Sequence, residues 1–354
     1  MRIVPVALLL VAFSAGCASL GPKTIPRDRA EYVQGLRDSW KRQLLLNMVG
    51  LRYGEAPVFL EVASVINQYS LEGQVSAGVG WSTGVGGDAQ SIGAAGRFAD
   101  RPTITYTPVT GERFVRSMLT PIPPVSLVAM VQAGWPVDFV FRLAVRSMNE
   151  LGNSSGARLM GSAGDPDFFR VLDALRRIQQ TGTIGMRFEK REREEAAVLL
   201  LAGRGVEAVA DDIRFVREKL RLAQGTRELR ITFGAVPADD REIAMVTRSM
   251  TEVLLELASW IEVPEGDIAE GRAAPTRKPE KLEEVEISPL VRVRSAQDEP
   301  RGAFVSVRMR DHWFFIDDRD LPSKRVFSFL MLLLSLTETG GGQATPLVTV
   351  GAGS

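Results

Sequence analysis

The sequence has 354 residues, of which 45% are hydrophobic and 24% charged, so the chain carries enough apolar material for a folded core. Its 43 basic and 43 acidic side chains give a formal net charge of zero, which argues against a nucleic-acid-binding protein. One Cys and one His exclude an internal disulfide, a multi-Cys zinc site and a multi-His metal site, and we expect no cofactor.

The first residues of the chain predict export. Arg2 supplies a positive charge, and residues 3–13 form an apolar run that is too short for a membrane span, which needs about 20 residues. The run ends in the tetrapeptide Ser14-Ala15-Gly16-Cys17, which resembles the lipobox of bacterial lipoprotein precursors, although Ser14 stands where that family prefers a large aliphatic residue.

This resemblance implies a signal peptide over residues 1–16, lipidation of Cys17 and a short tether over residues 17–27. With Ala18 after the Cys, it also implies a lipid-anchored protein on the periplasmic face of the outer membrane. The alternative is cleavage at an ordinary small-residue site, which leaves Cys17 as a free thiol in the periplasm.

The first part of the body, from residue 28, predicts a helix followed by extended segments. Apolar residues recur at three- and four-residue steps from Asp28 to Val49, which favours an amphipathic helix. Residues 57–62 predict a short strand. Apolar and small polar residues then alternate from Leu71 to Trp81, which predicts a half-exposed strand, and Arg101–Thr107 is a candidate for its partner.

Eight glycines lie between Gly73 and Gly96 and could form a phosphate-binding loop. Because no helix is predicted directly after them, a hairpin or loop is favoured. We also hold open that this hairpin meets lipid or another envelope protein.

The middle of the chain alternates between helical and extended patterns. Asp165 and Pro166 mark a clear helix start, because Asp caps a helix and Pro suits its first turn. The other predicted helices are 112–119, 126–133, 211–223 and 239–261, and the predicted strands are 137–147, 196–201 and 229–233.

The segment Gly152-Asn153-Ser154-Ser155-Gly156 matches the G-x-S-x-G pattern of a hydrolase nucleophile. Ser154 would be the nucleophile, and His312 is its only candidate base. A hydrolase needs a helix directly after the Ser, and small residues follow instead, so a loop is favoured.

The last third of the chain begins with residues 266–286, which predict a flexible loop or linker. Extended segments are predicted over 290–294, 303–309, 313–316 and 346–350, with a turn over 310–312. Residues 326–336 are apolar all round, which predicts a buried helix.

Three acidic residues, Asp317, Asp318 and Asp320, lie between the last of these strands and the helix. Clustered carboxylates can hold Mg²⁺ or Ca²⁺. The favoured alternative is a turn and helix N-terminus, with the acids capping backbone amides and pairing with Arg319 or Lys324.

Two segments together resemble an uncharacterised family of proteobacterial envelope lipoproteins. They are Arg101–Tyr106 running into the Thr120–Pro124 stretch, and His312–Asp320 before Ser323 and Lys324. The resemblance implies location and carries no activity.

The sequence therefore predicts an α+β protein with helices, short mainly antiparallel strands and a buried C-terminal helix. Its body, residues 28–354, is expected to be one unit or two lobes over 28–160 and 161–354. We expect a non-enzymatic binding or scaffolding role with an envelope protein or cell-wall partner. A periplasmic hydrolase or a metal-binding enzyme is the alternative.

Overall fold

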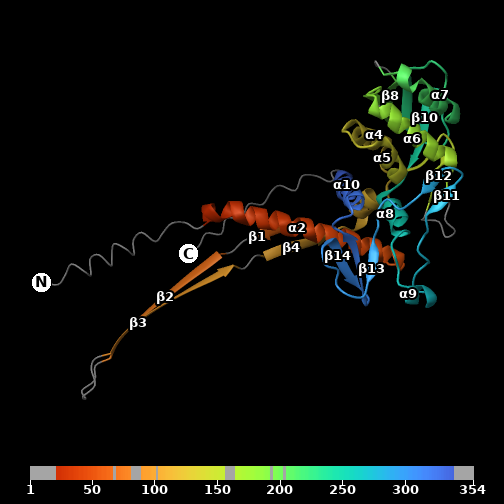
Figure 1. Cartoon of the computed structure of the whole chain (residues 1–354). Helices are drawn as coiled ribbons and strands as arrows, with labels where there is room; N and C mark the ends of the chain where they lie inside the picture. The colour runs from red at the N-terminus through yellow and green to blue at the C-terminus, as the bar shows by residue number, and fades with distance from the viewer. Residues whose placement is uncertain are drawn as a thin grey trace. The chain divides into compact units, whose positions relative to one another are not determined.

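A computed structural model gives the fold of the chain (Figure 1). It describes residues 21–66, 69–80, 89–100, 103–155, 164–191, 194–201 and 205–338. Helices and mainly antiparallel sheets make up these residues, which confirms the predicted α+β class. The predicted strand over 346–350 lies outside them. Within the described residues, no helix is both long and apolar enough to cross a membrane.

The chain divides into two compact units. The first takes Met1–Pro57 and Ser117–Thr337, and the second takes Val58–Arg116 and Glu338–Ser354. The predicted lobes met near residue 160, whereas strands on both sides of that point share one sheet of the first unit.

The first unit is built on a six-stranded sheet with the order β6-β5-β10-β9-β8-β7. All neighbouring strands are antiparallel except β9 and β10, which are parallel and pair Ile231 with Ile243. The strands are β5 (Val145–Met148), β6 (Leu151–Gly152), β7 (Ile184–Arg191), β8 (Glu194–Leu201), β9 (Glu228–Phe233) and β10 (Glu242–Thr247).

Four helices pack with this sheet and with one another. They are α4 (Pro124–Gln132), α5 (Val137–Ala144), α6 (Pro166–Gln180) and α7 (Ala210–Lys219). α4 contacts β7, β8 and β9, while α6 packs against both α5 and α7. The α6 start is confirmed, because the Asp165 side chain accepts a hydrogen bond from the Asp167 backbone N–H.

The rest of the first unit joins the N-terminal helix to a small sheet. α2 (Gly21–Arg52) contains the predicted helix and contacts both β14 (Ala303–Met309) and α8 (Met250–Ala258). The small sheet has the order β13-β15-β14, with β13 (Arg294–Ala296) and β15 (His312–Asp317).

The C-terminal helix α10 (Leu321–Glu338) is partly buried. Phe327, Phe329 and Leu330 are fully buried, whereas Leu332 is 50% exposed. The predicted C-terminal helix is thus present, with one apolar side still open.

Two predicted elements in the first unit are wrong in type. Of the strand expected over 137–147, only residues 145–147 are extended, in β5. Residues 137–144 form α5, because Pro136 and Asp138 favour a helix start and Val137, Val140 and Phe141 form a buried helical face. Residues 239–261 were expected as one helix. They form β10 and then α8, because a capping box between Ser249 and Glu252 starts the helix there.

The segment 266–286 is partly ordered, in place of the expected flexible loop. It contains most of α9 (Glu265–Ala269), and the strands β11 (Glu280–Leu282) and β12 (Val285–Ile287) pair with each other at its end. Asp267 is buried and accepts a hydrogen bond from the Tyr53 hydroxyl over 2.7 Å. Long-range polar contacts therefore anchor a segment whose composition suggested a linker.

The second unit is dominated by two antiparallel strand pairs. β1 (Leu60–Ile66) pairs with β4 (Thr103–Pro108), and β2 (Tyr69–Gly80) pairs with β3 (Ala89–Asp100); α3 (Gly111–Phe114) follows. The strand expected over 71–81 is confirmed as β2. Its expected partner over 101–107 is wrong, because the nearer segment 89–100 pairs with it.

Candidate functional site

The predicted lipidation site lies outside the described residues, which begin at residue 21. Cys17, the lipobox and residues 18–20 of the tether therefore stay predictions, whereas residues 21–27 of the expected tether are helical. α2 begins at Gly21, inside the segment expected to be the tether.

The predicted serine nucleophile is buried. Ser154 follows β6 and is only 3% exposed, and its carbonyl oxygen accepts a hydrogen bond from the buried Arg248 guanidinium. His312 begins β15 in the other sheet, and no hydrogen bond joins its ring to Ser154. The structure therefore does not assemble this pair into a nucleophile and its base.

The acidic cluster is engaged in local contacts. Asp317 accepts from the Arg319 backbone N–H over 2.8 Å, and Lys324 Nζ lies 2.6 Å from Asp318 Oδ1. Asp320 accepts from the Ser323 N–H over 3.1 Å and from its hydroxyl over 2.8 Å. These are the contacts of the favoured turn and helix cap. Among the described residues, no group of three or more His, Cys, Asp or Glu side chains could hold a metal ion.

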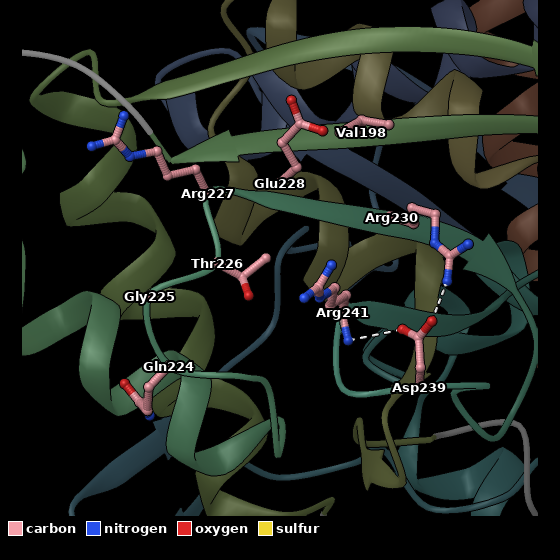
Figure 2. A pocket seen from close by; sticks show the side chains of 9 residues that line it. All are labelled: Val198, Gln224, Gly225, Thr226, Arg227, Glu228, Arg230, Asp239 and Arg241. Carbon is pink, nitrogen blue, oxygen red and sulfur yellow. Dashed lines mark hydrogen bonds and ion pairs between the residues drawn. The ribbon is translucent and has the colours of Figure 1, made fainter.

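An open polar cleft of about 750 Å³ lies at the start of β9 (Figure 2). The loop from α7 to β9 forms one wall, and the segment before β10 forms the other. The lining residues are Val198, Gln224, Gly225, Thr226, Arg227, Glu228, Arg230, Asp239 and Arg241.

Backbone hydrogen bonds hold these walls together. The Ala223 N–H donates to the Asp240 carbonyl over 2.7 Å, and the Arg230 N–H donates to the Arg241 carbonyl over 2.9 Å. Gly225, with φ of +80°, supplies the turn that leads into β9. The cleft is therefore set by the return of the chain over residues 234–241, which brings β10 parallel to β9.

One ion pair fixes the floor of the cleft. Arg230 Nη2 lies 2.5 Å from Asp239 Oδ2, and the Arg241 N–H donates to Asp239 Oδ1 over 2.9 Å (Figure 2). The Arg241 N–H and the charge of Arg230 hold the pKa of Asp239 below its ordinary value. Asp239 therefore remains ionised at neutral pH and compensates the charge of Arg230.

Two other arginines of the cleft form no ion pair within the described residues. Among the described residues, neither Arg227 nor Arg241 has an ion pair or a side-chain hydrogen bond, and both are exposed. The Arg241 guanidinium extends across the cleft toward Thr226, whereas Arg227 points away from Asp239 (Figure 2).

This arrangement suits the binding of an anion. A guanidinium presents planar donors that match a carboxylate or phosphate, and the Thr226 hydroxyl can add a further hydrogen bond. The nine lining residues, all described, include no His, Cys, Ser or Lys.

This cleft was not predicted from the sequence. Its charged residues occur in two short groups, Arg227-Glu228 with Arg230, and Asp239 with Arg241, which resemble ordinary exposed loop residues. The available signal was their position directly before two strands. This position brings the two groups together only because β9 and β10 pair in parallel. The sequence predicts a helix where β10 lies, so this pairing was not expected.

Comparison with known proteins adds no relative to this picture. No protein-family model, no curated protein and no solved structure matches the chain. The resemblance to envelope lipoproteins therefore stays a prediction, and the function has to be argued from the residues of the cleft.

Proposed function

We propose that this chain is a lipid-anchored protein of the bacterial cell envelope that binds a partner carrying an anionic group. The anchor is supported by the tetrapeptide Ser14-Ala15-Gly16-Cys17 after a short apolar run. Residues 17 onward would then stand on the periplasmic face of the outer membrane, where cell-wall polymers and other envelope proteins are within reach.

The exposed guanidinium of Arg241, which has no ion pair among the described residues, carries the proposal for binding. It faces Thr226 across an open cleft whose other central arginine, Arg230, is already paired with Asp239. A carboxylate or phosphate group placed between Arg241 and Thr226 would gain charge-assisted hydrogen bonds, which are about twice as strong as neutral ones. Cell-wall polymers carry such groups, so we take them as the partner class.

Sedimentation of the purified protein with isolated peptidoglycan sacculi tests this function. We expect wild type to sediment with the sacculi and Arg241→Ala to bind at least tenfold more weakly, because one charged hydrogen bond contributes about 1.5–3 kcal/mol. Arg214→Ala is the matched control, since Arg214 is an exposed arginine of α7 that does not line the cleft. Equal binding by wild type and Arg241→Ala would refute the role of the cleft.

The anchor is tested separately by metabolic labelling with palmitate. We expect label in wild type and none in Cys17→Ser, because the sequence has no other Cys. Label in both proteins would exclude Cys17 as the lipidated residue.

The alternative of a hydrolase or metal-binding enzyme has no supporting contact among the described residues. A serine-reactive fluorophosphonate probe that labels wild type but not Ser154→Ala would revive the hydrolase. A calorimetric heat with Ca²⁺ or Mg²⁺ that disappears in Asp318→Ala would revive the metal site.

A further inference from the structure

The N-terminal part of α2 lies outside the core of the first unit. α2 is one continuous helix from Gly21 to Arg52 (Figure 1). None of the residues 29–43 is buried, whereas all of the residues 44–50 except Leu46 are buried. β14 and α8, which contact α2, therefore cover its second part. The stretch over 29–43 is about 22 Å long and has no such cover within the described residues.

An apolar stripe on this stretch continues a stripe of the core. Residues three and four positions apart share one face of a helix, so Val33, Leu36, Trp40 and Leu44 form one line along α2. Leu44 is 2% exposed, whereas Val33 is 47% exposed and Trp40 is 46% exposed. Leu36 is half-buried. The stripe that packs into the core at Leu44 thus extends toward the N-terminus with only partial cover from the described residues.

Exposed arginines accompany the stripe. Arg29, Arg37 and Arg42 are exposed and form no ion pair within the described residues. Residues 29–43 carry four basic and two acidic side chains, in a chain whose formal net charge is zero. Arg29 lies four residues before Val33 and continues the line of the stripe, while Arg37 lies four residues after Val33 and borders it. An apolar stripe with neighbouring arginines is typical of helices at the surface of an anionic membrane.

The start of α2 lies close to the proposed anchor in the chain. Only residues 18–20 separate Cys17 from Gly21, and an extended chain over these steps spans at most about 14 Å. Val33 lies about 18 Å further along the helix axis. A helix that stands upright on the membrane therefore carries Val33 above the headgroups, whereas a helix that lies flat brings the whole stripe into the interface.

We infer that the N-terminal part of α2 lies flat on an anionic phospholipid surface, with Val33, Leu36 and Trp40 facing the acyl chains. Trp is enriched at this depth of a bilayer, and Arg can bury its methylene stem while its guanidinium reaches the phosphates. A second copy of the helix on the same stripe would bring arginines together and is therefore disfavoured. The inference rests on the lipid anchor of the proposed function and is independent of the anionic partner of the cleft.

Single cysteines along one turn of α2 test this orientation. When Cys17 carries its lipid, its sulfur is blocked, so an added Cys is the only thiol of the protein purified from cell envelopes. Val33→Cys and Leu36→Cys place a fluorophore on the stripe. Gln34→Cys and Gly35→Cys place it on the other side of the helix, where both residues are exposed and a Cβ at Gly35 meets no atom within 4 Å.

We expect the pattern of a helix in vesicles of phosphatidylethanolamine and phosphatidylglycerol. Fluorophores at 33 and 36 should be quenched several-fold more by brominated acyl chains than fluorophores at 34 and 35. Equal quenching at all four positions, or quenching at none, would overturn the inference. Quenching at none together with energy transfer between labelled copies would assign the stripe to a second copy instead. Circular dichroism checks that each variant folds like its parent, and two positions on each side protect the result against one misfolded variant.

The state of Cys17 separates failure of the anchor from failure of this inference. Denatured wild type should take up no thiol reagent, because its one Cys is lipidated. Uptake by wild type would refute the anchor, and with it the reason to place α2 at a membrane. Absence of the helical quenching pattern in protein with a blocked Cys17 would refute only the orientation of α2.

Headgroup charge is tested by lipid composition and by one arginine. Replacing phosphatidylglycerol with phosphatidylcholine should lower the quenching at position 33 by about twofold, because the arginines lose their anionic partners. Arg37→Gln in the Val33→Cys protein should act in the same direction. Arg214→Gln is the control, because Arg214 is an exposed arginine of α7. Quenching that neither change affects would overturn the role of anionic headgroups.

Discussion

Arg277 Nη1 lies 3.1 Å from Glu256 Oε1, and both side chains are at most 10% exposed. Arg248 approaches the other oxygen of the same carboxylate at 3.8 Å, and its burial lowers its pKa. Arg277 also lies over the Trp260 ring, 4.5 Å from its centre. One buried carboxylate of α8 thus forms ion pairs with two guanidiniums. Arg248 in addition donates hydrogen bonds to the carbonyl oxygens of Leu143 and Ser154.

Removing that carboxylate should destabilise the first unit strongly. We expect Glu256→Gln to lower the free energy of unfolding by about 3 kcal/mol, because it removes the carboxylate beside the buried Arg248 and leaves Arg277 with Glu280 alone among the described residues. Urea denaturation followed by circular dichroism measures the change. Asp211→Asn is the control, since it breaks an exposed pair with Arg214 and should cost less than about 1 kcal/mol. Equal costs for the two variants would contradict this account.

A glycine contact beneath Ser154 should be similarly sensitive. Gly164 has φ of +86°, and a Cβ built there would lie 2.6 Å from the Ser154 backbone nitrogen. Gly182 has φ of +69° and open space around it. Both Gly→Ala variants bear the strain of positive φ, about 1–2 kcal/mol, but only Gly164→Ala adds a backbone clash. Gly164→Ala should therefore show the lower melting temperature of the two, and a reversed order would contradict the close approach.

The cap of α10 can be separated from its neighbouring acid. Asp320→Ala removes the acceptor for the Ser323 N–H and should cost about 1 kcal/mol. Asp318→Ala removes a partly exposed pair with Lys324 and should cost much less. Chemical denaturation of the two variants side by side measures the difference. A larger loss in Asp318→Ala would assign the cluster another role.

Asp267 should make stability depend on acid pH. The Tyr53 hydroxyl and Arg272 hold the pKa of Asp267 below its ordinary value of 3.8. A carboxyl whose pKa is lower in the folded state stabilises above its unfolded pKa, and that contribution disappears as pH falls through the folded pKa. The stability difference between wild type and Asp267→Asn should therefore be constant near pH 7 and shrink below about pH 4. A difference that does not vary with pH would show that Asp267 contributes only through packing.

Local sequence signals correctly predicted the elements in which helix-start residues and apolar periodicity indicate the same structure. Asp165 and Pro166 mark the start of α6, and the apolar steps before Val49 mark α2. The wrong predictions occurred where the same spacing of apolar residues fits both a strand and a helix. Val137, Phe139 and Phe141 alternate as in a strand, yet Val137, Val140 and Phe141 also share a helical face, and tertiary packing selects the helix.

The candidate cleft was less predictable than the fold, for a physical reason. Single residues such as Arg241 have no distinctive sequence context, and their meaning depends on which strands are neighbours. That pairing is a long-range property. The capping box at Ser249 and Glu252 could have separated β10 from α8, but it could not have shown that β10 lies beside β9.

The short return between β9 and β10 carries residues of the cleft that are not part of the sheet. Adjacent parallel strands usually require a crossover of a dozen residues or more, often a helix. Here residues 234–241 suffice, and they carry Asp239 and position Arg241. Lengthening a loop costs little folding free energy. An insertion in this return could therefore leave the sheet intact while moving Arg241, so the shape and charge of the cleft can change by loop length alone.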